Sequence, residues 1–200
     1  MANIDAPFGL KPVKDAFSGA YAGQINSYYI GPGDATELRV GDPVSLAGGS
    51  NPAIAGLGVA SERREGEFLT ITRATGGASN FLCGVVVGFE PTAVVGYERE
   101  SYRKANEERI VLVMDDPDAE FEVQCASGTV PVAANMGALA DLSVVGSTDV
   151  YGRSATELDL TSIAATGNEQ VRITGLSSRI GNEMLEHAVV RVKINKHQLA

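Results

Sequence analysis

Three stretches between residues 81 and 124 decide the fold: FLCGVVVGF at 81–89, IVLVM at 110–114 and AEFEVQ at 119–124. The first two are rich in valine and are bounded by Gly, Pro and Asp, which favours strands over helices. In the third, apolar and polar residues alternate, as in a strand that buries one face. We therefore expect its apolar residues to be buried and Glu120, Glu122 and Gln124 to face water.

Shorter strand patterns, separated by turn residues, occur along the rest of the chain. The clearest lie at residues 28–30, 68–73, 171–176 and 188–196. Residues 54–60 are small and apolar and indicate a further strand, and residues 136–142 indicate one helical turn. Closely spaced short strands predict a mainly β fold, a small β-barrel or sandwich with few short helical turns.

The N-terminal residues 1–27 show no periodicity, and two prolines at positions 7 and 12 disfavour a helix. We interpret them as an extended N-terminal arm, with residues 28–200 as a single β-rich domain. The arm is either a mobile terminus or an extended segment that lies along another subunit or along its own barrel. Phe8 and Leu10 favour the second interpretation, because their apolar side chains gain nothing from exposure to water.

Composition and charge exclude several classes of function. The net charge of −9 repels phosphate, so we expect no nucleic-acid partner. No apolar run approaches the roughly 20 residues that span a bilayer, so we expect no membrane partner. The first residues lack the basic and apolar regions of a secretory signal, which predicts synthesis in a cytoplasm.

The chain offers little metal-binding chemistry in any familiar spacing. Cys83 and Cys125 are the only cysteines, and their apolar contexts predict two buried reduced thiols, with a disulfide as the alternative. Two thiols and two histidines do not make a convincing zinc site. The acidic residues 115–120 lack the Gly and Glu of a calcium loop, so we interpret them as a turn between strands. We expect no metal.

No catalytic constellation is visible either. His187 and His197, the only histidines, are expected to be solvated, and the nearby GLSSR at 175–179 lacks the last glycine of a nucleophile elbow. GLGVAS at 56–61 begins like a dinucleotide fingerprint but has serine at its third glycine position. The charged segment 90–109 predicts a solvated face, with a polar interface loop as the alternative. We expect no cofactor and no enzymatic activity.

The opening MANIDAPFGLKPV at 1–13 resembles the start of a family of small structural proteins of tailed bacteriophages. Further points of likeness follow in the family's order: YYI at 28–30, VGDPV at 40–44, GVVVGFEP at 84–91, VLVMDDP at 111–117, ELD at 157–159 and VKINKHQ at 192–198. GDPV at 41–44 and GVV at 84–86 also look like the β-barrel core of phage head-decoration proteins.

The resemblance implies a structural virion protein, a capsid decoration or cement protein. Such a protein binds the outer surface of an icosahedral phage head and stabilises contacts between major capsid subunits. Its partners would be the major capsid protein and further copies of itself, as a dimer or trimer. A tail, neck or head-fibre protein is the alternative, and a hydrolase or sugar-binding β-barrel is a more distant one. We expect the capsid or subunit contacts at Pro7, Phe8, Leu10, Val13, Tyr97 and Tyr102.

Overall fold

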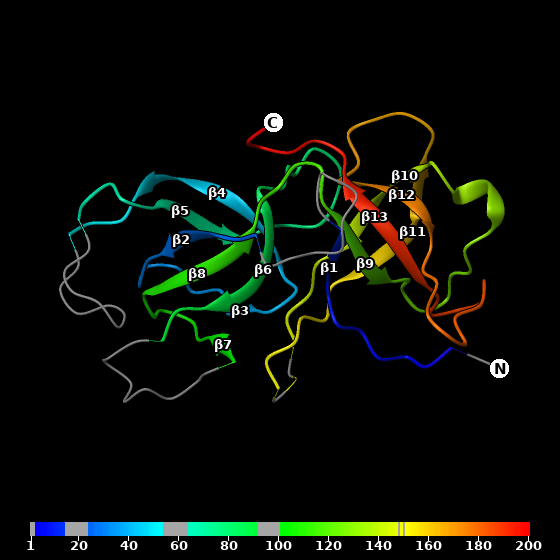
Figure 1. Cartoon of the computed structure of the whole chain (residues 1–200), viewed down its shortest axis with the longest axis horizontal. Helices are drawn as coiled ribbons and strands as arrows, with labels where there is room; N and C mark the ends of the chain where they lie inside the picture. Colours follow the sequence, from blue (N-terminus) through cyan, green and yellow to red (C-terminus); the bar gives the residue numbers. More distant parts are fainter. Residues whose placement is uncertain (1–2, 15–23, 54–63, 92–100, 148, 150) are drawn as a thin grey trace.

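The computed structural model describes residues 3–14, 24–53, 64–91, 101–147, 149 and 151–200 (Figure 1). It is mainly β, as the sequence predicts, and contains both a closed barrel and a separate six-stranded sheet. The barrel and the sheet lie side by side, at the left and right of Figure 1. Among the described residues, no helix has the length and apolar content that crossing a lipid bilayer requires.

The barrel contains two of the three deciding stretches as neighbouring strands. Its strands, in order around the barrel, are β2 (Asn26–Ile30), β5 (Leu69–Arg73), β4 (Pro43–Ser50), β6 (Gly84–Phe89) and β8 (Arg109–Met114). All pairs are antiparallel except β2 with β5. Val86, Val111 and Val113 are fully buried in its core, which explains the valine-rich pattern. The short strands β3 (Leu38–Arg39) and β7 (Tyr102–Arg103) pair with each other.

The six-stranded sheet is antiparallel throughout. Its order is β1 (Lys11–Lys14), β9 (Glu120–Gln124), β13 (Val189–Ile194), β12 (Val171–Leu176), β10 (Leu139–Ser143) and β11 (Glu157–Ala164). Phe121, Val123 and Val192 are buried in its core. A short 3-10 helix, η1 (Ala133–Asn135), precedes β10. The helical turn predicted over residues 136–142 is therefore wrong, since most of that range extends into β10.

The sheet curls until its last strand returns to β9. The backbone of Leu158 in β11 forms an isolated bridge with Cys125, the residue after β9, and the Ala126 amide donates to the Leu158 carbonyl at 3.0 Å. Earlier in the chain, Glu120 to Glu122 on the same edge of β9 pair with β1. We call this line between β9 and β11 the seam. Unlike the barrel, the sheet is closed here by a single backbone bridge.

Residues 3–14 of the predicted arm lie along their own chain. Lys11–Lys14 form the edge strand β1, and Leu10 is 1% exposed, with its amide donating to the Gly41 carbonyl at 2.9 Å. Gly9 packs on the same loop: a Cβ there would lie 2.4 Å from the Gly41 oxygen, and its φ of 71° favours glycine. The arm thus joins the sheet to the barrel.

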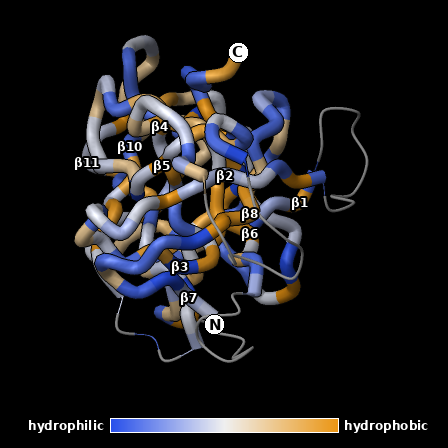
Figure 2. The backbone as a smooth tube through the Cα atoms, turned by 90° about the vertical axis from the view of Figure 1, so that its left-hand side faces the viewer, coloured by the Kyte–Doolittle hydropathy of each residue, from blue (hydrophilic) through white to orange (hydrophobic). Residues whose placement is uncertain are grey.

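Two expectations about exposure are wrong. Glu122 and Gln124 are buried rather than solvated, because other segments cover the face of β9 that the alternation assigned to water: Ser177 and Arg179 bind Glu122, and the arm binds Gln124 through Ile4. Arg103 and Arg109 of the charged segment are also buried. Figure 2 shows hydrophobic residues gathered along β6 and β8 and more hydrophilic loops outside them. The strand predicted at residues 54–60 lies outside the described residues.

Candidate functional site

The structure brings four of the six predicted contact residues together on the arm. Pro7, Phe8 and Val13 are half-buried, whereas Leu10 is buried in the core of the sheet and is not accessible to a neighbour. Tyr102 is half-buried in β7, with the Arg39 guanidinium 4.3 Å above its ring. Tyr97 lies outside the described residues.

A groove of about 560 Å³ runs between the arm and the barrel. Its walls are mainly apolar, and three cationic side chains, Lys11, Arg153 and Arg179, stand along it. The Arg179 guanidinium lies 4.6 Å from the centre of the Phe8 ring, which is cation–π geometry. The groove therefore combines apolar walls with positive charge in an otherwise acidic protein.

Glu122 binds Arg179, one of the cationic side chains that line the groove. Its carboxylate accepts hydrogen bonds from the Arg179 Nε at 2.9 Å and from the Ser177 hydroxyl. Burial alone would raise the pKa of Glu122, but the hydrogen bonds from Arg179 and Ser177 outweigh it, so the pKa lies below its ordinary value. Glu122 is therefore ionised at neutral pH and holds Arg179 over Phe8.

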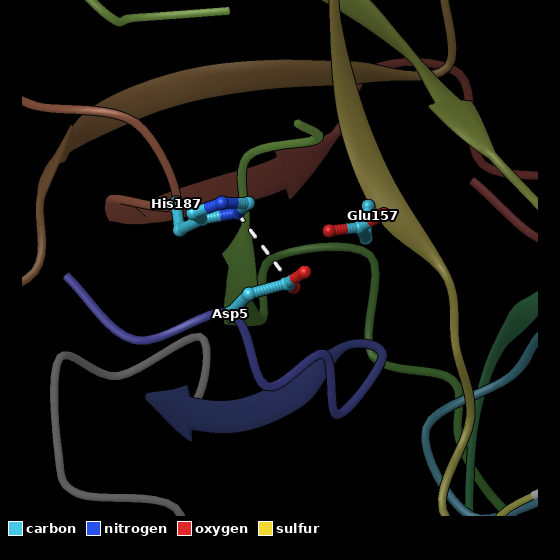
Figure 3. A group of neighbouring side chains, drawn as sticks. All are labelled: Asp5, Glu157 and His187. Carbon is cyan, nitrogen blue, oxygen red and sulfur yellow. Dashed lines mark ion pairs between the residues drawn. The ribbon is translucent and has the colours of Figure 1, made fainter. Parts of the chain in front are cut away.

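A second group of polar side chains lies at the seam: Asp5 on the arm, Glu157 at the start of β11, and His187 just before β13 (Figure 3). One carboxylate oxygen of each acid and one ring nitrogen of His187 lie within 4.8 Å of one another. The His187 Nδ1 is 3.6 Å from the Asp5 Oδ1. We call these residues the seam triad.

Two amide side chains explain why the arm reaches the triad. The buried Gln124 donates from its Nε2 to the Ile4 carbonyl at 2.7 Å and to the His187 carbonyl at 3.2 Å, and its Oε1 accepts the Ala6 amide at 3.1 Å. The Asn3 side chain donates to two carbonyls of the turn before His187, each at 3.0 Å. Asp5 is therefore held between residues that are themselves tied to the His187 turn.

The triad is partly buried, contrary to the solvated histidine expected from the sequence. The His187 side chain is 15% exposed, and burial followed by the charge of Asp5 raises the pKa of Glu157, while His187 opposes that shift. The His187 Nδ1 and the Glu157 Oε1 have no hydrogen-bond partner in the described part of the chain. An imidazole nitrogen with two carboxylates is a donor set that holds divalent metal ions.

His197 also differs from its prediction. It is half-buried, and burial lowers its pKa, although nearby acidic residues oppose that shift. Its Nδ1 accepts the Leu199 amide at 3.1 Å. The two histidines therefore have different surroundings, one beside two carboxylates and the other in the C-terminal turn.

The remaining sequence candidates have structural roles in the described residues. Cys83 and Cys125 are buried and free, as predicted, and burial raises the pKa of Cys83 to about 11 and of Cys125 to about 12. Asp115, in the predicted turn, accepts the Tyr28 hydroxyl at 2.6 Å. Arg103 is fully buried and donates to four backbone carbonyls, those of Gly31, Asp34, Thr36 and Glu107.

Exposed apolar side chains gather near the seam triad. Ile4 is 82% exposed, and the neighbouring residue Asn3 hydrogen-bonds the backbone of Glu183 and Glu186, on either side of the exposed Met184 and Leu185. Ile180, fully exposed, belongs to the same connection between β12 and β13. We call Ile4, Met184 and Leu185 the apolar tip. Such a group in contact with water is typical of an interaction surface.

Comparison of the chain with protein-family models, with curated proteins and with solved structures finds no match.

Sequence reasoning missed both the seam triad and the apolar tip. The triad joins residues 5, 157 and 187, so no local spacing reveals it. The residues of the tip are an isolated isoleucine and a short turn, which carry no periodic signal. The one hint in the sequence was that residues near its two ends, such as Ile4 and His187, have no obvious contact partner in their local pattern.

Proposed function

We propose that this chain is a structural virion protein, a decoration or cement protein that binds the outer surface of an icosahedral phage head. In this role it stabilises contacts between major capsid subunits and associates with further copies of itself. The likeness of its opening and of its later landmarks to tailed-phage structural proteins supports the assignment to a virion.

The structural observation that carries the proposal is the apolar tip beside the arm. Three large apolar side chains stay exposed there, whereas most other large apolar residues in the described part of the chain are buried or half-buried. Removing apolar surface from water contributes about 25 cal/mol per Å², so a partner that covers the tip gains binding energy. The tip is therefore the surface that we expect to face a coat subunit, with Ile4 taking the role that the sequence assigned to Leu10.

The charge and repetition of a capsid fit the same role. A net charge of −9 keeps the protein soluble at high local concentration and is unfavourable against packaged DNA. A single weak contact suffices, because many copies on one lattice and contacts between neighbouring copies raise the overall affinity. Binding to the assembled shell alone stabilises that state by mass action.

The test uses heads of the parent phage assembled without this protein. Added purified protein is expected to bind in many symmetric copies, seen by cryo-electron microscopy, and to raise the temperature at which the heads release DNA. The double variant Ile4→Ser, Leu185→Ser should bind at least about tenfold more weakly, because two apolar contacts of about 1.5 kcal/mol or more are lost.

The matched control is Leu69→Ser, which removes a 48% exposed apolar side chain from barrel strand β5, away from the tip. It should bind like the unmodified protein. Equal binding by the double variant would refute the tip as the contact surface. Failure of the unmodified protein to bind heads would refute the cement role, and a few copies at one vertex would favour a tail, neck or fibre protein.

A further inference from the structure

We propose that the seam triad, Asp5, Glu157 and His187, binds a divalent transition-metal ion, best fitted by Zn²⁺, and that this ion fastens the arm across the seam. Three segments that are distant in sequence meet there: the arm, the start of β11 and the turn before β13. The inference is independent of the capsid role, since it concerns how the chain holds its own N-terminal segment.

The donor set selects the class of metal. Imidazole nitrogen suits Zn²⁺ and its first-row neighbours, whereas Ca²⁺ and Mg²⁺ prefer oxygen ligands alone. Three protein ligands with an open fourth position are a common zinc arrangement. Ligand distances of about 2.0–2.2 Å place tetrahedral donor atoms about 3.4 Å apart. The donor atoms here lie within 4.8 Å of one another, with the His187 Nδ1 and Asp5 Oδ1 at 3.6 Å, so a shift of about 1 Å suffices.

Two of the three ligand atoms are available to bind a metal ion. The Nδ1 of His187 and the Oε1 of Glu157 are shielded from solvent and have no hydrogen-bond partner within the described ranges. Buried polar atoms in folded proteins nearly always have a partner, so each one without a partner calls for an explanation. A metal ion between them supplies one partner to both atoms. Asp5, which is 58% exposed on the arm, is the ligand that is free to adjust its position.

The surroundings pre-organise the site. Gln124 binds the backbone of His187 and of Ile4 and Ala6, so one buried side chain positions two of the three ligands. His187 adopts a φ of 60°, a left-handed conformation that is uncommon outside glycine, and this places its ring at the seam. The Nε2 on the other side of the ring faces the Glu186 carboxylate at 3.9 Å, the position of an outer-shell partner in many zinc sites.

The seam gives such an ion a structural purpose. Backbone hydrogen bonding joins β9 to β11 at one bridge only, and the arm is held there mainly by side chains. An ion bound to Asp5, Glu157 and His187 links the arm to both sides of the seam. It binds the folded state alone, so it stabilises that state and orders the arm.

The test is titration of the metal-stripped full-length protein with ZnCl₂ by calorimetry at pH 7.5. We expect one equivalent of Zn²⁺ to bind, to raise the melting temperature, and to slow amide hydrogen exchange in residues 4–8. Co²⁺ in place of Zn²⁺ should give visible absorption bands of a four- or five-coordinate site. Asp5→Asn should weaken Zn²⁺ binding at least about tenfold and abolish the protection of the arm.

The two histidines supply the matched pair of variants. His187→Asn removes the imidazole while keeping a residue that tolerates the left-handed backbone, and should lose the calorimetric signal. His197→Asn removes the only other imidazole and should leave binding unchanged. Unfolding without metal, followed by circular dichroism, checks that each variant is folded. Absence of binding by the unmodified protein up to millimolar Zn²⁺, or equal binding by the folded Asp5→Asn variant, would overturn the proposal.

Discussion

The barrel and the six-stranded sheet close in different ways. Around the barrel every strand pairs with two neighbours, so the backbone itself completes the ring. The sheet ends at a seam with one backbone bridge, and the rest of that closure consists of side chains from the arm, β9 and the turn before β13. Backbone ladders depend little on residue type, whereas a seam closed by side chains depends on each residue in it.

The difference assigns separate roles to the two parts. The barrel and the short strands β3 and β7 that accompany it form a scaffold, in which the buried Arg103 of β7 donates to four backbone carbonyls of neighbouring connections. The sheet and the arm present the seam triad and the apolar tip, which remain open to other molecules, and the groove lies between the arm and the barrel. Substitutions in the barrel region should therefore affect stability alone, and substitutions at the seam should affect both stability and the state of the arm.

The largest expected effect belongs to the barrel region. Arg103→Met should lower the free energy of unfolding by about 3–5 kcal/mol, because it removes the donors to four carbonyls and the charge beside Asp34. Urea unfolding followed by circular dichroism measures the change. The control Arg172→Met removes an exposed arginine of β12 and should cost less than about 1 kcal/mol. Comparable losses in the two variants would show that Arg103 is not a structural anchor.

An intermediate effect is expected at the seam. Gln124→Met keeps the side-chain volume but leaves the Ile4 and His187 carbonyls and the Ala6 amide without their partner. This should lower the free energy of unfolding by about 2–4 kcal/mol. Hydrogen exchange should also become faster in residues 4–8, by a larger factor than in β8. Gln198→Met, which removes one hydrogen bond of an exposed glutamine, is the control. Uniform acceleration of exchange across the barrel and the sheet would contradict the separate roles of the two parts.

The smallest expected effect is on the pH dependence of folding stability. It is tested with one buried carboxyl group from each part of the molecule. The pKa of Glu122 in the sheet is lowered, so its stabilising contribution is present above its ordinary value of 4.5 and is lost as the pH falls. Burial raises the pKa of Asp42, the residue just before β4, from 3.8 to about 6, so stability decreases as the pH rises from about 4 to 6.

Glu122→Gln should therefore lower stability by about 1–2 kcal/mol at pH 7 and by less at pH 3, whereas Asp42→Asn should raise it by about 1–2 kcal/mol at pH 7 and have little effect at pH 3. Asparagine still accepts the Arg39 amide that now binds Asp42 at 2.8 Å. Urea midpoints at several pH values provide the comparison. The same pH dependence in both variants would show that the two environments do not differ as described.

Much of the barrel could be predicted from local pattern. The stretches 81–89 and 110–114 contain β6 and β8, because a run of valines bounded by Gly and Asp is stable mainly as a buried strand. The buried reduced cysteines followed from the same apolar contexts. Alternation also identified β9 correctly, but it assigned Glu122 and Gln124 to water, because alternation describes one strand and not what covers its second face.

The sequence alone determined the strand-rich class, the acidic surface and the position of the main strands, since these depend on short-range periodicity and on composition. Tertiary structure alone decided that the arm returns to its own sheet, that Arg103 is buried among carbonyls, and that Asp5, Glu157 and His187 meet at the seam. The reason is physical: these features arise from contacts between residues up to 182 positions apart. Their formation depends on how the barrel and the sheet close, which no local pattern encodes.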